Sequence, residues 1–151
     1  MITHLIFDLD NTLYSTQSFT AEEEADSFSI DFELRNFLAS IPLPKAVLTN
    51  SMQKYADEVI DRLGIRDQFE HIFDISYSNF KGKPHPDAFL IPLKIMGARP
   101  ENTLFIDDFP GHVAGFLKIG GNALLLDEFD RYTETAYQRI KHLKEIKNYL
   151  T

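Results

Sequence analysis

The stretch His4-Leu5-Ile6-Phe7-Asp8-Leu9-Asp10-Asn11-Thr12-Leu13 decides the fold of this chain. Its apolar start, Leu5 to Phe7, is typical of a buried strand, and Asp8 and Asp10 stand where that strand ends. Side chains two residues apart on a strand point to the same side, so the two carboxylates are expected to lie together. Neighbouring carboxylates repel each other unless a cation or a shared proton holds them. The pattern therefore predicts a metal site, although Asp and Asn also form ordinary turns at strand ends.

The composition is that of one globular domain, residues 1–151. The chain is 44% hydrophobic and 25% charged, and it is long enough to bury a core. The formal net charge of -8 disfavours nucleic acid or an anionic membrane as a partner, because both select basic surfaces. The absence of cysteine excludes disulfides and thiolate ligands. No apolar run approaches the ~20 residues that span a bilayer, and no charged leader precedes the first strand, so we expect a cytoplasmic protein.

Strands and helices are expected to alternate along the chain. The expected strands are five short apolar runs at residues 4–8, 45–49, 71–75, 103–106 and 122–126. Helical patterns cover residues 34–38, 52–63 (closed by Gly64), about 86–96, and the residues after Pro110. This alternation predicts an α/β protein with a parallel sheet covered by helices on both faces.

Two segments stand apart from this pattern. Residues 133–150 carry apolar side chains on one helical face, at Ala136, Ile140, Leu143, Ile146 and Leu150. We expect a C-terminal helix there that covers the core, with a partner-binding helix as the alternative. Residues 14–31 are polar without a strong period, so they are expected to form a surface loop or a short mobile helix.

Polar residues follow the ends of the expected strands, where ligands bind in an open parallel sheet. The second strand leads into Thr49, Asn50 and Ser51, which offer an anion seat at a helix start or a simple helix cap. The fourth strand ends in Asp107 and Asp108, and a second acidic pair at the same edge needs a cation. Since all these ligands are oxygens, Mg²⁺ is the favoured ion.

Two basic residues precede the third helix. Lys83 is expected to reach into the acidic cluster or to bind a phosphate as a point charge. His85 is the only histidine expected near this edge, and we interpret it as a specificity or structural residue.

Taken in order, four short motifs resemble those of the haloacid dehalogenase superfamily of phosphohydrolases. They are Asp8-Leu9-Asp10-Asn11-Thr12, Val47-Leu48-Thr49-Asn50, Lys83-Pro84 and Asp107-Asp108. The resemblance extends from residue 4 to about 127. The amino-acid sequence around the first motif and at residues 78–89 is similar to that of the pyrimidine 5'-nucleotidase-like branch.

The resemblance implies a Rossmann-like three-layer α/β/α sandwich with five parallel strands in the order 5-4-1-2-3. It also implies roles for the motif residues. Asp8 would attack phosphorus and become an aspartyl phosphate, and Asp10 would be the general acid and base. Thr49, Asn50 and Lys83 would hold the phosphoryl oxygens. The ligands of Mg²⁺ would come from Asp8, Asp10, Asp107 and Asp108.

Relatives in that branch carry a helical cap between the first two motifs, and here only residues 14–44 separate them. We therefore expect a cap-less or minimally capped Mg²⁺-dependent phosphatase with an open site, monomeric or dimeric, acting on a phosphorylated metabolite or macromolecule. The alternative is a non-catalytic, metal-binding regulatory module on the same fold. A phosphoacceptor domain of the response-regulator kind is disfavoured, because its phosphorylated acid follows a middle strand.

Overall fold

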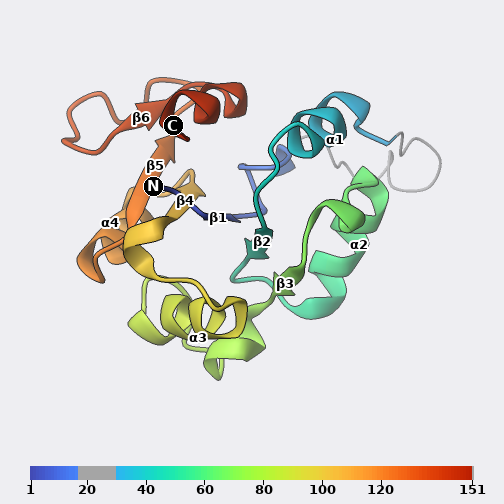
Figure 1. The fold of residues 1–151 in the computed structure, drawn as a ribbon, viewed down its shortest axis with the longest axis horizontal. Helices are drawn as coiled ribbons and strands as arrows, with labels where there is room; N and C mark the ends of the chain where they lie inside the picture. Colours follow the sequence, from blue (N-terminus) through green and yellow to red (C-terminus); the bar gives the residue numbers. More distant parts are fainter. Residues whose placement is uncertain (17–29, 151) are drawn as a thin grey trace.

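The computed structural model describes residues 1–16 and 30–150, which form a parallel sheet with helices around it (Figure 1). The strands are β1 (His4–Phe7), β2 (Lys45–Leu48), β3 (His71–Phe73), β4 (Thr103–Asp107), β5 (Asn122–Leu126) and β6 (Arg139–Ile140). The α-helices are α1 (Phe32–Ala39), α2 (Gln53–Leu63), α3 (Pro86–Met96) and α4 (Pro110–Lys118). The order β3-β2-β1-β4-β5-β6 confirms the predicted 5-4-1-2-3 arrangement. The predicted number of strands was wrong, because β6 extends the sheet beyond β5.

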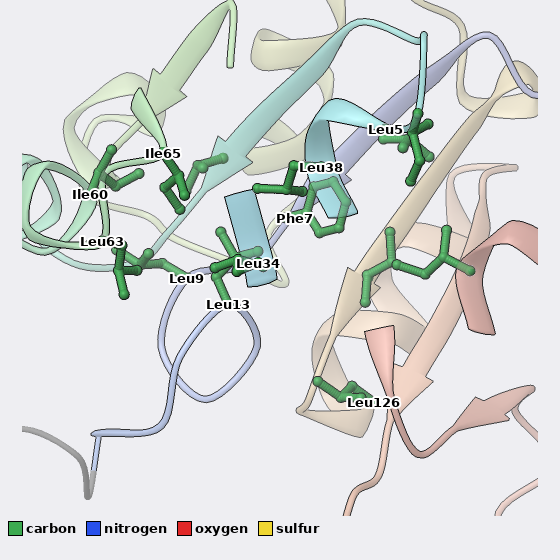
Figure 2. Packing of buried hydrophobic residues seen from close by; sticks show 14 of the residues in the cluster. Leu5, Phe7, Leu9, Leu13, Leu34, Leu38, Ile60, Leu63, Ile65 and Leu126 are labelled. Carbon is green, nitrogen blue, oxygen red and sulfur yellow. The ribbon is translucent and has the colours of Figure 1, made fainter. Parts of the chain in front are cut away.

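Alternating side chains of the strands build one core on each face of the sheet. On β1, Leu5 and Phe7 join the core under α1 and α2, while Ile6 joins the core under α3 and α4. Figure 2 shows the first of these cores, where Leu34 and Leu38 of α1 lie beside Phe7. The helices therefore cover both faces, as predicted, and the chain is a three-layer α/β/α sandwich.

Local sequence signals set the helix ends. Asp31 precedes α1 and its Oδ1 accepts a hydrogen bond from Leu34 N at 2.9 Å, which satisfies a free N–H of the first turn. Gly64 ends α2 with φ of 70°, a left-handed conformation that glycine adopts without strain. Pro110 occupies the first turn of α4, where its missing N–H costs no hydrogen bond.

The C-terminal segment differs from the helix predicted over residues 133–150. It contains strand β6 and a 3₁₀ helix at Leu143–Tyr149. Backbone bonds to β5 explain the difference: Leu125 N donates to Gln138 O at 2.9 Å and Asp127 N to Ile140 O at 2.8 Å. The open edge of β5 thus binds this segment as a strand, and Ile140 and Ile146 still enter the core.

The loop predicted over residues 14–31 includes positions 17–29, which lie outside the described residues. Among the helices within residues 1–16 and 30–150, none has the length and apolar character that crossing a membrane requires.

Candidate active site

Three carboxylates meet where β1 and β4 end. The two strands pair in parallel with Phe7 opposite Ile106, so the next residues, Asp8 and Asp107, stand side by side. Asp108 follows directly. One carboxylate oxygen from each of the three acids lies within 4.8 Å of the others. The predicted convergence of Asp8 with Asp107 and Asp108 is therefore present at the carboxyl edge of the sheet.

The ammonium of Lys83 lies inside this group of acids. Its Nζ donates to Asp8 Oδ1 at 2.8 Å, to Asp107 Oδ2 at 3.0 Å and to the carbonyl of Leu48 at 2.8 Å. The Lys83 side chain has no exposed area, and its Nζ lies 5.5 Å from the centre of the Phe105 ring. Burial acts to lower the pKa of Lys83, but Asp8 and Asp107 outweigh it and raise that pKa, so the ammonium stays charged.

Asn50 binds the Lys83 backbone, and Gly115 lets α4 pack closely against the next residue, Pro84. Asn50 Oδ1 accepts from Lys83 N at 2.8 Å, and Asn50 Nδ2 donates to Lys83 O at 3.1 Å. On the other side, a Cβ atom on Gly115 would stand 2.7 Å from Pro84 Cβ, so only glycine allows α4 to approach this closely. Asn50, predicted to bind phosphate, thus spends both polar atoms of its side chain on positioning Lys83.

Asp10 lies toward β2 and is held by two hydroxyl groups. Ser51 Oγ donates to Asp10 Oδ2 at 3.0 Å, and the Tyr14 hydroxyl donates to Asp10 Oδ1. Burial and the Asp10 carboxylate raise the pKa of Tyr14, so its phenol stays protonated and remains a donor. Thr49, buried at the end of β2, accepts from Ser51 N at 3.0 Å through its Oγ1. Asp10 and Thr49 are thus linked through Ser51, which donates to both of them.

Two residues at the site were not predicted as site residues. Thr12 Oγ1 lies 3.2 Å from Asp8 Oδ2 and 3.4 Å from Asp108 Oδ1, and it links two of the acids. His112 Nδ1 lies 3.0 Å from Asp107 Oδ2. The expectation that His85 is the only histidine near this edge was therefore wrong, because the first turn of α4 brings His112 back over Asp107. His85 caps α3 by accepting from Asp87 N at 3.1 Å.

The acids outnumber the cations that are buried with them. Burial raises the pKa of Asp8, although the Lys83 ammonium opposes this. Burial, helped by Asp8, raises the pKa of Asp108 to about 8. Asp107 differs: burial acts to raise its pKa, but Lys83 and His112 outweigh it and lower that pKa. The cluster therefore lacks positive charge on the side of Asp108, and a divalent cation with oxygen ligands fits that deficit.

Fold and site together define a three-layer α/β/α protein with an acidic centre at the carboxyl edge of its parallel sheet. The chain belongs to the haloacid dehalogenase-like hydrolase family, whose model matches residues 34–120. A curated relative, the (S)-2-haloacid dehalogenase of Xanthobacter autotrophicus, is 25% identical over 79 residues. That match covers 52% of this chain and 31% of the relative, so the chain matches about a third of the relative's length.

Solved structures share this fold. The L-2-haloacid dehalogenase of Xanthobacter autotrophicus with chloropropionic acid covalently bound has a TM-score of 0.80 and 14% identity, covering 98% of both chains. A HAD hydrolase of Bacillus subtilis bound to magnesium has a TM-score of 0.77 and 14% identity over 99% of both chains. The HAD phosphatase of Thermococcus onnurineus has a TM-score of 0.76 and 17% identity, covering 99% of this chain and 98% of its own.

Proposed function

We propose that this protein is a Mg²⁺-dependent phosphomonoester hydrolase that works through an aspartyl-phosphate intermediate. The observation that carries the proposal is the buried Lys83 ammonium beside Asp8 within a group of three carboxylates. Phosphoryl transfer requires positive charge around the transferring oxygens and a nucleophile next to that charge. A lysine and a metal site around one aspartate meet both requirements.

Asp8 is the nucleophile in this proposal. Its Oδ1 accepts from Lys83 Nζ at 2.8 Å and its Oδ2 lies 3.2 Å from Thr12 Oγ1, so the carboxylate is held in one orientation. An oriented carboxylate loses less entropy when it attacks phosphorus. Attack forms the Asp8–phosphorus bond and breaks the bond to the leaving alkoxide or phenoxide oxygen.

Asp10 is the general acid and base. The Ser51 and Tyr14 hydroxyls fix its carboxylate two residues after Asp8 in the chain. In the first step Asp10 gives a proton to the leaving oxygen, and in the second it takes a proton from the water that cleaves the aspartyl phosphate. The Thr49 hydroxyl donates to a phosphoryl oxygen. Lys83, whose three N–H donors bind Asp8, Asp107 and the Leu48 carbonyl, contributes its positive charge next to the phosphoryl group.

Asp8, Asp107 and Asp108 are the side chains that would hold Mg²⁺. Asp107 accepts from Lys83 Nζ, His112 Nδ1 and Phe109 N. Asp108 lies beside Asp8 and the Thr12 hydroxyl, and no basic side chain within residues 1–16 and 30–150 forms an ion pair with it, so Asp108 has more acceptor capacity for a cation. When bound, the ion neutralises the acids as an anionic substrate approaches and draws charge from the phosphoryl oxygens. The magnesium-bound hydrolase of Bacillus subtilis, which shares the fold, supports this choice of ion.

Dehalogenation is the second candidate, since relatives of this chain are named as 2-haloacid dehalogenases. That reaction also needs a carboxylate nucleophile. A haloacid, however, does not bring phosphoryl oxygens that require a metal, so that reaction would make no use of the cation that the deficit at Asp108 favours. This deficit favours the phosphatase over the dehalogenase.

Phosphate release from p-nitrophenyl phosphate and from a panel of pyrimidine nucleoside monophosphates, with and without Mg²⁺, tests the proposal. Mg²⁺-dependent release is expected, and Asp8→Asn is expected to abolish it. Asp67→Asn is the matched control, because it makes the same charge change in an ion pair with Arg35 on the surface. Halide release from 2-chloropropionate without phosphate release would favour the dehalogenase. Mg²⁺ binding with neither product would favour the non-catalytic module.

A further inference from the structure

A pocket of about 330 Å³ opens beside the group of three acids. Thr12 and Asp108 form its wall on the side of the reaction centre. The same pocket is also lined by residues that follow β5, namely Glu128, Phe129, Arg131 and Tyr132. A leaving group attached to a phosphoryl group at Asp8 has this space next to it, so the residues after β5 are in position to select the substrate.

The segment that follows β5 is fixed by one buried aspartate. Asp127 Oδ1 accepts from Arg131 N at 2.8 Å, and Asp127 Oδ2 accepts from Tyr132 N at 2.9 Å and from Arg139 Nη1 at 3.0 Å. The Asp127 residue is only 3% exposed. Because both carboxylate oxygens bind the backbone of the segment, Arg131 starts from a defined backbone position, which lowers the entropy cost of binding a ligand there.

The guanidinium of Arg131 is free to bind a ligand. It lies over the Phe129 ring, with Cζ 5.4 Å from the ring centre. Within residues 1–16 and 30–150 no acid forms an ion pair with it, whereas Arg139 and Lys141 nearby pair with Asp127 and Asp130. In a chain with a net charge of -8, an arginine without an ion-pair partner in a pocket at the reaction centre is a recognition feature for an anion.

We propose that Arg131 binds a second acidic group of the substrate, a carboxylate or a further phosphate, on the leaving-group side of the phosphoester. This inference rests on the proposed phosphatase function. The planar guanidinium matches either oxyanion with paired N–H donors, and the Phe129 ring supports its orientation. The substrate class is then a phosphomonoester whose alcohol or phenol part is itself anionic.

The other charges that line the pocket determine whether each substitution should strengthen or weaken the binding of an anionic ligand. Asp108 faces the metal site, and Asp127 is matched by Arg139. Glu128 is exposed, lines the same pocket and opposes an anionic ligand. Removing the charge of Glu128 should therefore strengthen recognition, while removing the charge of Arg131 should weaken it.

Two esters with the same number of heavy atoms and the same branching, 3-methylbutyl phosphate and 2-carboxyethyl phosphate, test the inference in the full chain with Mg²⁺. The wild type is expected to prefer the carboxylated ester in kcat/KM. Arg131→Gln should lower that preference by roughly tenfold, the size of one charge-assisted hydrogen bond. Arg131→Lys should keep part of it, and Glu128→Gln should increase it. Arg99→Gln is the control, because Arg99 is exposed and precedes β4 at the opposite edge of the sheet.

Calorimetric titration of the Asp8→Asn protein with both esters gives the same comparison without turnover. Equal kcat/KM and equal affinity for the two esters, or a preference that Arg131→Gln leaves intact, would overturn the role of Arg131. If the wild type hydrolyses neither ester nor p-nitrophenyl phosphate nor the nucleoside monophosphates, the phosphatase proposal fails. The titration then decides by itself whether Arg131 binds the carboxylate.

Discussion

Two neighbouring strands each end at a buried aspartate, and the two aspartates differ in what surrounds them. Asp107 is the last residue of β4, and Asp127 directly follows β5, which pairs with β4. Both carboxylates accept hydrogen bonds on each oxygen, and both have a cation within about 3 Å. Taken singly, the two sites look alike.

The two aspartates differ in the carboxylates that lie nearest to each of them. Asp130, near Asp127, has Lys141 Nζ at 2.9 Å, so both of these aspartates have a basic partner. Asp8 and Asp108 stand beside Asp107, and Lys83 is the ammonium shared by this group. A balanced aspartate fixes a backbone segment, whereas an excess of buried acid leaves a site that attracts a cation. An acid at a sheet edge thus indicates chemistry when the charge around it does not balance.

Substitution of Lys83 should give the largest effect. Lys83→Met leaves Asp8 and Asp107 buried without their cation, and we expect a loss of about 3–5 kcal/mol in the free energy of unfolding. Urea denaturation measures it. Lys81→Met is the matched control. Lys81 lies two residues before Lys83 and forms an exposed ion pair with Asp87, so this variant should leave the urea midpoint nearly unchanged. Equal losses in both variants would mean that the buried ion pairs of Lys83 contribute little.

Substitution of Asp127 should have a smaller effect of a different kind. Asp127→Asn weakens the hydrogen bonds to Arg131 N, Tyr132 N and Arg139, and we expect a loss of about 1–3 kcal/mol in urea denaturation. Because this region is already neutralised, the variant should keep the stabilisation that Mg²⁺ gives the wild type. Loss of the Mg²⁺-dependent rise in the melting temperature would contradict the separation of the two regions.

The pH dependence of stability should report the excess acid directly. The pKa of Asp108 is raised to about 8, above its ordinary value of 3.8, because burial and Asp8 disfavour its charged form. The folded state therefore holds a proton that the unfolded state releases, and stability should fall as pH rises from about 4 to about 8. In EDTA we expect a loss on the order of 1 kcal/mol, since solvent screens this half-buried group.

Thermal denaturation in EDTA across this pH range measures the effect. Asp108→Asn should flatten the profile, and Mg²⁺ should flatten the wild-type profile by replacing the proton. A profile that stays steep in Asp108→Asn would assign the proton to another group.

The smallest effect is expected at His112. His112→Gln removes one partly exposed hydrogen bond to Asp107 while Lys83 and Phe109 N remain, so a loss of about 0.5 kcal/mol is expected. Urea denaturation checks this value. A loss as large as that of Lys83→Met would mean that the histidine, rather than the lysine, carries the balance of the cluster.

The sequence predicted the centre of the molecule better than its C-terminal part. The strand ending in Asp8 and the one ending in Asp107 are apolar runs that only a buried strand explains, and the parallel fold brings their ends together. Over residues 133–150 the spacing of Ile140 and Ile146 matches a helix. Both residues are buried, but the open edge of β5 determines the backbone there. A pairing partner so far away in the chain leaves no local pattern.

The site residues that were missed depend on similar geometry. His112 reaches Asp107 because α4 starts directly after the acidic pair, and Pro110 was the available signal of that start. Thr12 stood inside the first motif, but its hydroxyl reaches Asp8 and Asp108 only because the chain turns after β1. In both cases the sequence identifies a polar residue near the site, but it does not predict which way the side chain points.

Because α4 packs so closely against Pro84, a substitution in this contact could disrupt the site without changing any site residue. Gly115 bears no functional group, yet a methyl group there would displace the segment that carries Lys83. A homologue with alanine at position 115 would keep the aspartates of the site, Lys83 and Asn50, so a comparison of site residues alone would not reveal the change. Lineages of this fold that have lost their reaction are therefore to be sought in the packing between α4 and the lysine segment, as well as among the residues that touch substrate.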